Sequence, residues 1–494
     1  MEAMTLNHQQ ICPGGVNDRR LCFQACRRKG KNEMTETEIR NRLSEHGHGY
    51  LFNYWDARSP RMKRRLIEDL ETIDLAMLDE LRTHIGQAKE AAAGSALEPA
   101  PYIPRVQSAA DRSAREIGED LIRGGKTAVL TVAGGQGSRL GFNLPKGMFP
   151  VSPIRKLTLF AVHAEKLLAA RRWFGVEIPW LIMTSPSNRA VTEEYFRKQV
   201  WFGLGSTSVH FFTQGTLPSF SPGGELLMAP DGGLLFNPDG HGGLIAALHS
   251  SGMLQELHAQ GIEELFYFQV DNPIARVPDA QFLGFHRRAG SEISSKVVPK
   301  AYPEENLGVI ATMGGAPYVI EYSDLDDRLK QARDREGKLL FSQASIAIHL
   351  LNVNFLSQSG LSLPYHLAQK KVLALVPGAK STEILSKDAI KVEKFIFDAI
   401  PIARTAIFFE TDRIEEFAPI KNREGVDSIT TCIRGQIEKA ARWLSACGVE
   451  VPRDSEGKSL HTIEISSLFA LDQEALAAKR GSLKDSIDED TLLA

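Results

Sequence analysis

Cysteine is scarce in this chain, with five residues among 494. An odd and sparse set does not support a disulfide framework and is typical of proteins that work in a reducing compartment. Near the N-terminus no fourth ligand stands at a standard zinc-binding spacing, so unpaired thiols in a loose tail are favoured there over a metal site. The cysteines are Cys12, Cys22, Cys26, Cys432 and Cys447.

Long apolar runs are absent as well. No stretch of about 20 apolar residues occurs, so no membrane-spanning helix is expected, and the N-terminus lacks the apolar segment of a secretory signal peptide. The formal net charge is only -3, which does not indicate bulk binding to nucleic acid or to an anionic membrane. We therefore expect a cytoplasmic protein without nucleic-acid or membrane partners, in which a few local charges bind any phosphate.

The length and composition indicate a globular protein of several domains. Apolar residues make up 43% of the chain and charged residues 24%, and 494 residues are too many for one core. Residues 1–33 are polar and irregular, and we expect them to form a disordered extension. Residues 34–105 are predicted to form a helical N-terminal region, residues 106–385 the main domain, and residues 386–494 a small C-terminal domain.

The N-terminal region carries a clear helix signal. Ser59-Pro60 is typical of an N-cap followed by proline at the first helical position. Apolar residues then recur at helical spacing over about 20 positions, which predicts one long amphipathic helix. These residues are Leu66, Leu70, Ile73, Met77, Leu81 and Ile85.

From residue 127 onward, apolar β-type runs alternate with helical stretches. Such alternation predicts an α/β domain with a parallel sheet. The expected strands are Thr127–Val132, Ile178–Met183, Val209–Thr213 and Leu265–Val270, with helices within Leu157–Arg172 and Leu244–Gln260. Later strands, expected to form a different, antiparallel extension, are Lys296–Val298, Val309–Thr312 and Tyr318–Tyr322, and a further strand at Thr405–Glu410 falls in the C-terminal region.

The strongest single signal is the glycine-rich segment Val132-Ala-Gly-Gly-Gln-Gly-Ser-Arg-Leu-Gly141, followed by Pro145-Lys146-Gly147. It comes directly after the first expected strand. Its glycines let the backbone turn tightly and bring N–H groups close to an anion. Arg139 and Lys146 add fixed positive charge. The segment therefore predicts a phosphate-binding loop.

Two familiar phosphate-binding patterns do not match this loop. From Gly135 it runs G-x-G-x-x-x-G, which differs from the dinucleotide-binding fingerprint G-x-G-x-x-G. It also lacks the G-x-x-x-x-G-K-[ST] pattern of a P-loop. The loop instead resembles the L-x-x-G-x-G-T-R-L…P-K signature of sugar-nucleotide pyrophosphorylases, with Ser138 in place of the usual Thr.

Among those enzymes, the loop is similar to the eukaryotic-type UTP-dependent sugar-1-phosphate uridylyltransferases, a branch with UDP-N-acetylglucosamine, UDP-glucose and UDP-sugar pyrophosphorylases. The resemblance runs from about residue 60 to about residue 440. It implies a Rossmann-like nucleotidyltransferase fold of the glycosyltransferase-A-like kind, with a mixed sheet and with residues 106–385 as the catalytic domain. The implied reaction joins UTP to a sugar 1-phosphate, of an N-acetylhexosamine or a hexose, and releases pyrophosphate.

The same resemblance implies a set of residues for UTP. Phe212-Thr-Gln-Gly-Thr-Leu-Pro218 resembles F-x-Q-G-x-x-P, in which Gln pairs with uracil, and an amide can donate and accept on one edge. Without the resemblance, Gln214 would be a surface residue in a turn. Asn237–Leu244 resembles the P-D-G-N-G-G segment, whose first glycine lies against the nucleotide. The implied set is Val132, Ala133, Gly134, Gly135, Lys146, Gln214, Gly240, Asp271 and Lys421.

A carboxylate closes one of the expected strands. Val270-Asp271-Asn272 stands where open α/β sheets place their ligand sites, just past the carboxyl end of a strand. The resemblance makes Asp271 the ligand of Mg²⁺, and one protein carboxylate can suffice because Mg²⁺ keeps several waters. An aspartate that only caps the following turn is the alternative.

The sugar side of the site departs from one branch of the family. His241 and Ser345 stand where the N-acetylglucosamine enzymes have asparagine, and a Gly-His-Gly segment is typical of UDP-glucose and UDP-sugar pyrophosphorylases. The implied sugar-binding residues are His241, Gly308, Ser345, Phe395 and Phe397. A structural role for His241 and a core role for both phenylalanines are the alternatives, and the sugar stays open.

Two segments of the C-terminal region supply further cations. Lys391-Val-Glu-Lys-Phe-Ile-Phe-Asp398 resembles K-M-E-K-F-V-F-D, and Phe417-Ala-Pro-Ile-Lys-Asn422 resembles F-S-P-L-K-N, whose Lys contacts the diphosphate. Taken alone, Lys421 would be a solvated lysine. The implied catalytic residues are Arg139, Lys146, Lys391 and Lys421. A non-catalytic UDP-sugar-binding regulatory protein on the same fold is the alternative, because a fold does not determine function.

Overall fold

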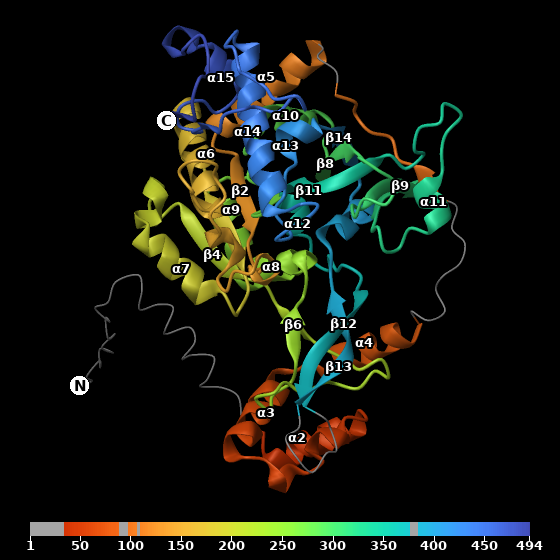
Figure 1. The fold of residues 1–494 in the computed structure, drawn as a ribbon. Coiled ribbons are helices and arrows are strands. Elements are labelled where there is room, and N and C mark those ends of the chain that lie inside the picture. The colour runs from red at the N-terminus through yellow and green to blue at the C-terminus, as the bar shows by residue number, and fades with distance from the viewer. Residues whose placement is uncertain (1–33, 88–96, 106–108, 376–383) are drawn as a thin grey trace, which may run out of the picture. The chain divides into compact units, whose positions relative to one another are not determined.

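The computed structural model describes residues 34–87, 97–105, 109–375 and 384–494 (Figure 1). The extension predicted at residues 1–33 lies outside these ranges, with Cys12, Cys22 and Cys26. The described chain packs into two units, each assembled from several segments, and the predicted domain boundaries stay a prediction. The first unit takes residues up to Gly86, Phe220–Leu235 and Lys371–Ala389, and the second takes Gln87–Ser219, Phe236–Lys370 and Ile390–Ala494.

Short helices form much of the first unit. Ser59 accepts a hydrogen bond from the Met62 N–H at 3.3 Å and Pro60 is the first helical residue, so the predicted helix start is confirmed. The side-chain oxygen of an N-cap serves a backbone N–H group that has no partner inside the helix. The helices are α2 (Glu36–Glu45), α3 (Pro60–Thr72) and α4 (Leu75–Gln87).

The prediction of one long helix in this unit is wrong, because the chain breaks between α3 and α4. Ile73 has an extended backbone with ψ of 137°. The Asp74 carboxylate accepts hydrogen bonds from the Ala76 and Met77 N–H groups at 2.9 and 3.2 Å. Aspartate competes with a continuous helix because its side chain offers these N–H groups a local partner. Apolar spacing alone does not report this cap.

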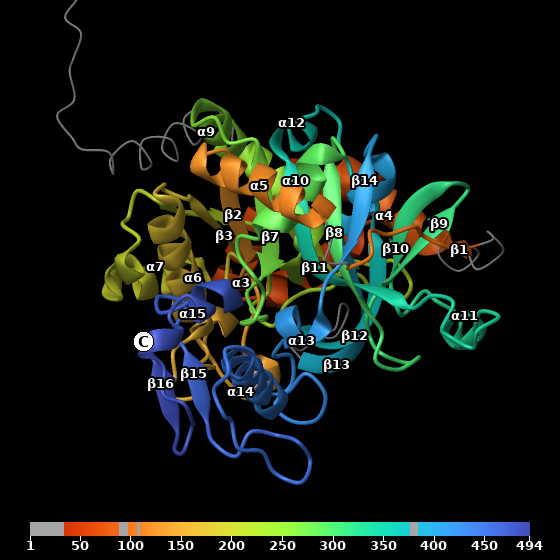
Figure 2. The ribbon, with the colours of Figure 1, turned by 90° about the horizontal axis from the view of Figure 1, so that it is seen from above.

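The second unit is built on a ten-stranded mixed sheet, counted over the described residues (Figure 2). At its centre β7, β2, β3 and β4 pair in parallel, and β11 pairs antiparallel with β7. These four strands confirm the predicted parallel part. Their bounds are β2 (Thr127–Val132), β3 (Trp180–Thr184), β4 (Val209–Thr213) and β7 (Glu264–Gln269).

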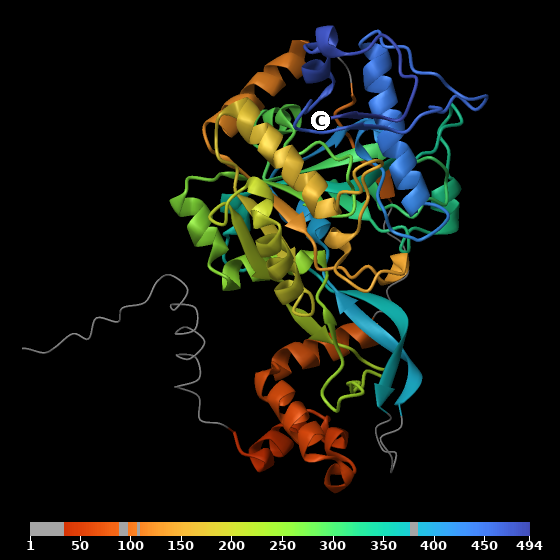
Figure 3. The same ribbon diagram turned by 60° about the vertical axis from the view of Figure 1, so that its left-hand side comes forward.

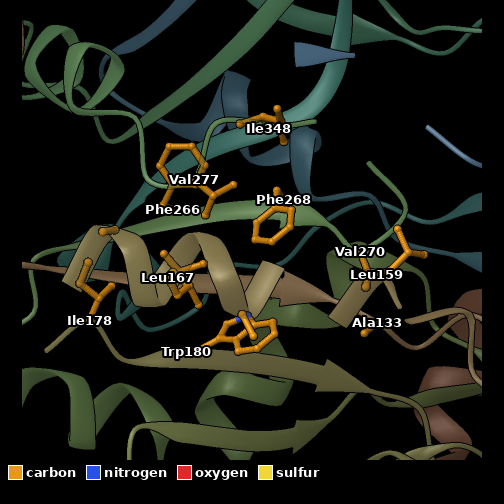
Figure 4. Packing of buried hydrophobic residues seen from close by; sticks show 14 of the residues in the cluster. Ala133, Leu159, Leu167, Ile178, Trp180, Phe266, Phe268, Val270, Val277 and Ile348 are labelled. Carbon is orange, nitrogen blue, oxygen red and sulfur yellow. The ribbon is translucent and has the colours of Figure 1, made fainter. Parts of the chain in front are cut away.

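Successive side chains of the central strands enter two different apolar clusters. Val129 and Trp180 belong to one cluster, and their neighbours Leu130 and Leu181 belong to the other. Figure 4 shows Trp180 in the first cluster. Because strand residues alternate between faces, helices must cover both, which explains the nearly continuous apolar run of β2. One face packs against α5 (Ala109–Arg123), α6 (Leu159–Phe174) and α10 (Ala280–Arg288), and the other against α8 (Leu244–Ser250), α9 (Met253–Ala259) and α12 (Val353–Leu356).

The helical stretch predicted at Leu244–Gln260 is present as two helices, α8 and α9. Gly252 separates them with φ of +75°, the left-handed region that glycine enters without strain. The strands predicted beyond residue 290 also form, with β8 antiparallel to β11 and β10 antiparallel to β9. They join the main sheet, so the prediction of a different extension is wrong. The bounds are β8 (Ile293–Pro299), β9 (Val309–Met313), β10 (Ala316–Ile320) and β11 (Gln343–Asn352), with β1 (Leu97–Pro99) beside β9.

The strand predicted in the C-terminal region joins the main sheet. It forms β14 (Ala406–Glu410) and pairs in parallel with β8. After it comes α14 (Ile429–Ala446), the longest of the described helices and blue in Figure 3.

The remaining elements are α7 (Arg189–Lys198), α11 (Asp327–Gln331), α13 (Arg413–Glu416), α15 (Gln473–Ala477), β5 (Thr216–Pro218), β6 (Phe236–Pro238), β12 (His366–Leu375), β13 (Ile384–Glu393), β15 (Ile463–Ile465) and β16 (Thr491–Leu493). Within the described ranges, none of the helices combines the length and apolar character that crossing a bilayer requires.

Helices α5 and α10 approach each other through glycine. A Cβ atom placed on Gly118 would lie 1.7 Å from the carbonyl oxygen of Ala280, and one on Gly284 would lie 1.6 Å from that of Ala114. No side chain fits at these distances, so the two backbones meet directly. This close packing covers one face of the sheet near β7.

We predict that Gly284→Ala destabilises the protein by about 1–3 kcal/mol, because the added methyl group must push α5 and α10 apart. The thermal unfolding midpoint, measured by calorimetry, reports the change. Gly86→Ala is the matched control, since Gly86 also lies in a helix but has no atom within 4 Å of a Cβ placed on it. The control should be neutral or up to ~1 kcal/mol stabilising. Equal midpoints for the two variants would contradict the close backbone packing.

Candidate functional site

The glycine-rich loop closes on itself directly after β2. The Lys146 N–H donates to the Gly135 carbonyl at 3.1 Å, and the Gly137 N–H donates to the Leu144 carbonyl at 3.0 Å. A Cβ atom on Gly137 would lie 2.8 Å from the Phe142 carbonyl oxygen. The loop therefore needs glycine there, and it holds Lys146 close to the end of β2.

Gln214 lies against this loop, at the end of β4. Its N–H donates to the Thr184 carbonyl at 2.9 Å, and its side chain is 6% exposed. A Cβ atom on Gly134 would lie 2.7 Å from the Gln214 side-chain oxygen, so only glycine leaves room for the amide. Ala133 is held between β3 and α7, since its N–H donates to Met183 and its carbonyl accepts from the Asn188 amide. The residues predicted to contact the base and the first phosphate thus lie together.

Lys146 and Asp271 form an ion pair that joins the loop to the end of β7. The Lys146 Nζ lies 2.8 Å from the Asp271 Oδ2, and the side chains are 17% and 10% exposed. Burial by itself raises the pKa of Asp271, but the charges of Lys146 and Lys421 outweigh it and the net pKa is lowered from its ordinary value. Asp271 is therefore a carboxylate at neutral pH, as a cation ligand must be.

Lys421 reaches the same place from the segment between β14 and α14. The Ile420 N–H donates to the Asp271 carbonyl at 2.9 Å, which fixes the backbone next to Lys421 against the end of β7. The Asn272 side chain strengthens this junction, because its amide donates to the Glu416 carbonyl at 2.7 Å and its oxygen accepts from the Ala418 N–H at 3.2 Å. Lys421 and Asp271 are thus positioned together by backbone contacts.

A cavity of about 760 Å³, including space open to solvent, lies beside this junction. Six residues predicted to bind substrate line it: His241, Asp271, Gly308, Ser345, Phe397 and Lys421. They come from segments far apart in the sequence. The Ser345 N–H donates to the Gly308 carbonyl at 2.8 Å, which joins the start of β11 to the residue before β9. The fold therefore brings the predicted sugar and phosphate residues to one hollow.

His241 has a defined hydrogen-bonding state at the cavity wall. The Ile396 N–H donates to its Nδ1 at 3.1 Å, and its ring stacks on Phe395 with centroids 5.1 Å apart and planes at 22°. Burial, together with the charge of His366, lowers the pKa of His241 to about 4. The ring is neutral at pH 7 and carries its proton on Nε2, because Nδ1 accepts. His241 can therefore offer one N–H donor to a ligand.

Gly240, the residue before His241, lets the backbone of Lys394 approach closely. Its φ is +85°, and a Cβ atom on it would lie 2.4 Å from the Lys394 carbonyl oxygen. The Gly242 N–H donates to that same carbonyl at 2.7 Å, and the Lys394 N–H donates to the Asp239 carbonyl at 2.8 Å. The segment 239–243 is therefore tied to the chain that follows β13.

Ten of the sixteen predicted residues do not line the cavity, and Lys391, Phe395 and Arg139 are three of them. Lys391 pairs with the Glu393 carboxylate and is not among the residues that line the cavity. Phe395 supports His241 and His366 from behind, whereas Phe397 reaches the wall itself. Arg139 is exposed and has no hydrogen bond or ion pair with any residue in the described ranges.

Several residues of the cavity wall were not predicted from motifs, among them Glu321 and Tyr322. Glu321 and Tyr322 follow β10 and line the cavity. Burial, followed by the charge of Asp324, raises the pKa of Glu321 above its ordinary value despite nearby His366 and Lys421. A carboxyl group in a sugar-sized hollow is suited to accept hydrogen bonds from hydroxyl groups. The one available signal was a charged residue, Glu321, within the apolar strand expected at Tyr318–Tyr322.

The chain is similar to proteins of one known family. A family model described as UTP--glucose-1-phosphate uridylyltransferase matches residues 103–431. UDP-N-acetylglucosamine diphosphorylase 1 of Arabidopsis thaliana is 35% identical over 431 residues, which cover 82% of this chain and 84% of that protein. UDP-N-acetylglucosamine pyrophosphorylase of Saccharomyces cerevisiae is 33% identical over 476 residues, which cover 91% of this chain and 98% of that protein.

A solved structure supports the fold. The uridine diphosphate N-acetylglucosamine pyrophosphorylase of Trypanosoma brucei matches with a TM-score of 0.75 at 24% identity, over 97% of this chain and 99% of that one. The family model spans the glycine-rich loop, Asp271 and Lys421. The family and the nucleotidyltransferase fold implied by the loop are thereby confirmed. The chain belongs to the UTP–glucose-1-phosphate uridylyltransferase family.

Proposed function

We propose that this protein transfers the uridylyl group of UTP to a sugar 1-phosphate, which gives a UDP-sugar and pyrophosphate. The observation that carries the proposal is the Lys146–Asp271 ion pair, which joins the glycine-rich loop to a cavity that also holds Lys421. Cations on one side and a sugar-sized hollow on the other match the two halves of this reaction. The names of the relatives support the same activity.

The reaction needs no nucleophile from the protein. A phosphate oxygen of the sugar 1-phosphate attacks the α-phosphorus of UTP in line, the new P–O bond forms, and pyrophosphate leaves with the electrons of the broken bond. Catalysis then consists of positioning and charge stabilisation. Lys146 neutralises the α-phosphate, Arg139 and the loop amides hold the leaving pyrophosphate, and Lys421 holds the sugar phosphate. Lys391 acts with Lys421 only if its ammonium group leaves Glu393.

Mg²⁺ fits the donor set at Asp271. Within the described ranges there is no group of three or more His, Cys, Asp or Glu side chains that could enclose a metal ion. A single ionised carboxylate beside a phosphate site suits Mg²⁺, which takes most of its ligands from substrate oxygens and water. When bound, the ion neutralises phosphate charge. Asp271 would hold it, and Lys146 would turn from the carboxylate to the phosphate.

Removal of divalent ions should therefore abolish activity. We predict that a chelator stops pyrophosphate release and that added Mg²⁺ restores it. Asp271→Asn should raise the Mg²⁺ concentration for half-maximal rate by about tenfold or more, because an amide is a weaker ligand than a carboxylate. Pyrophosphate release is measured across a Mg²⁺ titration. Full activity in excess chelator would remove the metal from the proposal.

The sugar is proposed to be an N-acetylhexosamine, as the names of the two relatives reported above suggest. A hexose is a second candidate because His241, not asparagine, lines the cavity. The cysteine usage, including the free thiols of Cys432 and Cys447, supports a reducing compartment such as the cytoplasm.

A substrate panel tests the function directly. We expect pyrophosphate release when the protein meets UTP, Mg²⁺ and N-acetylglucosamine 1-phosphate, with a lower kcat/KM for glucose 1-phosphate. His241→Asn should shift the ratio further toward the N-acetylated sugar by roughly tenfold, the size of one polar contact to substrate. No release with any hexose 1-phosphate would leave the non-catalytic, UDP-sugar-binding alternative.

Lys146→Ala should lower kcat by roughly 10²–10³, the loss seen when one preorganised charge-stabilising group is removed. Lys198→Ala is the control, because Lys198 is an exposed lysine on α7. Thermal unfolding of both variants verifies that they fold. A change confined to KM would show that Lys146 binds ground state and transition state equally, which contradicts the assigned role.

A further inference from the structure

Arg423 lies close to the end of the glycine-rich loop. Its Nη1 is 3.7 Å from the position that a Cβ atom on Gly141 would take. Gly141 ends the short 3-10 turn that contains Arg139, and its φ is +70°. The family motif around Lys421 ends at Asn422 and does not include Arg423.

The turn that carries Arg423 is well braced. The N–H groups of Lys421 and Asn422 both donate to the Asp427 carbonyl, at 2.7 and 3.0 Å. The Asn422 amide also donates to the Val426 carbonyl at 2.9 Å. Arg423 therefore belongs to a hydrogen-bonded turn that begins at Lys421.

The cations around the loop fall into two kinds. Lys146 is paired with Asp271, and Lys421 acts on the same carboxylate. Arg139 and Arg423 are both exposed, and neither has an ion pair or a hydrogen bond with a residue in the described parts of the chain. Lys146 and Lys421 therefore lie around the proposed α-phosphate site. Arg423 lies near Gly141, at the end of the turn that contains Arg139.

We propose that Arg423 binds the β- and γ-phosphates of UTP, and hence the pyrophosphate product, together with Arg139. The inference rests on the proposed uridylyl transfer. Two guanidinium groups suit this ligand because each presents a planar fork of donors that matches two phosphate oxygens. UMP, which lacks these phosphates, does not reach Arg423.

Equilibrium binding of UTP and UMP tests the proposal without any need for turnover. Arg423→Ala raises the Kd for UTP about tenfold and leaves the Kd for UMP within twofold, as measured by calorimetry in the presence of Mg²⁺. Arg423→Lys keeps part of the affinity for UTP, because a lysine retains the charge but not the fork. In the reverse reaction, from UDP-N-acetylglucosamine, the KM for inorganic pyrophosphate rises in parallel.

Arg172→Ala is the matched control, since Arg172 is an exposed arginine in the last turn of α6 and belongs neither to the glycine-rich loop nor to the cavity wall. It changes neither Kd. An unchanged Kd for UTP in Arg423→Ala overturns the inference, and so does an equal loss for UTP and UMP, which would mark a structural role. Wild-type protein that binds UTP but releases no pyrophosphate with any sugar 1-phosphate refutes the proposed function and leaves this test intact. Wild-type protein that does not bind UTP refutes both.

Discussion

Asp271 has a carboxylate that is 10% exposed at the end of a buried strand, and the ammonium group of Lys146 lies 2.8 Å from it. A buried charge without a partner is costly, and breaking such a pair leaves an uncompensated charge at a cost of roughly 3–5 kcal/mol. The ion pair therefore determines where the glycine-rich loop lies relative to β7.

A second buried cluster holds the segment that carries Lys421. The Lys296 ammonium group has no exposed surface and contacts Asp279 and Glu416 at 2.5 Å. Lys439 of α14 donates to the Ile274 carbonyl at 3.0 Å and to the Glu415 carbonyl at 2.7 Å. Burial lowers the pKa of Lys439 to about 8, and the charge of Glu415 opposes this shift. These contacts tie the chain after Asp271 to the chain before Lys421.

The electrostatics of the site follow from this arrangement. Cations come from the loop after β2 and from the segment before α14, and they face the carboxylate at the end of β7. The cavity wall opposite carries neutral donors and acceptors, such as His241, whose Nδ1 is already occupied by a backbone N–H. The proposed phosphate and sugar sites therefore present different surfaces.

Much of the fold was predictable because its signals are local. The four parallel strands are apolar on both faces, and each such run of five or six residues is visible without knowledge of its neighbours. The glycine-rich loop was equally clear in the sequence. The structure explains its glycines, since Gly134 and Gly137 have no room for a side chain and no other residue could replace them. The break at Asp74 was missed because a cap depends on one side chain and not on apolar spacing.

The amino-acid sequence by itself determined the strand pattern, the phosphate-binding loop and the residue types that phosphate and sugar require. The tertiary structure alone decided which of them meet. Lys146 and Asp271 are separated by 125 positions, and their contact depends on how β2 and β7 pair. Lys391 pairs with Glu393 in the same segment, a contact that its motif does not report. A pattern describes one segment at a time, whereas a binding site is made by the distances between segments.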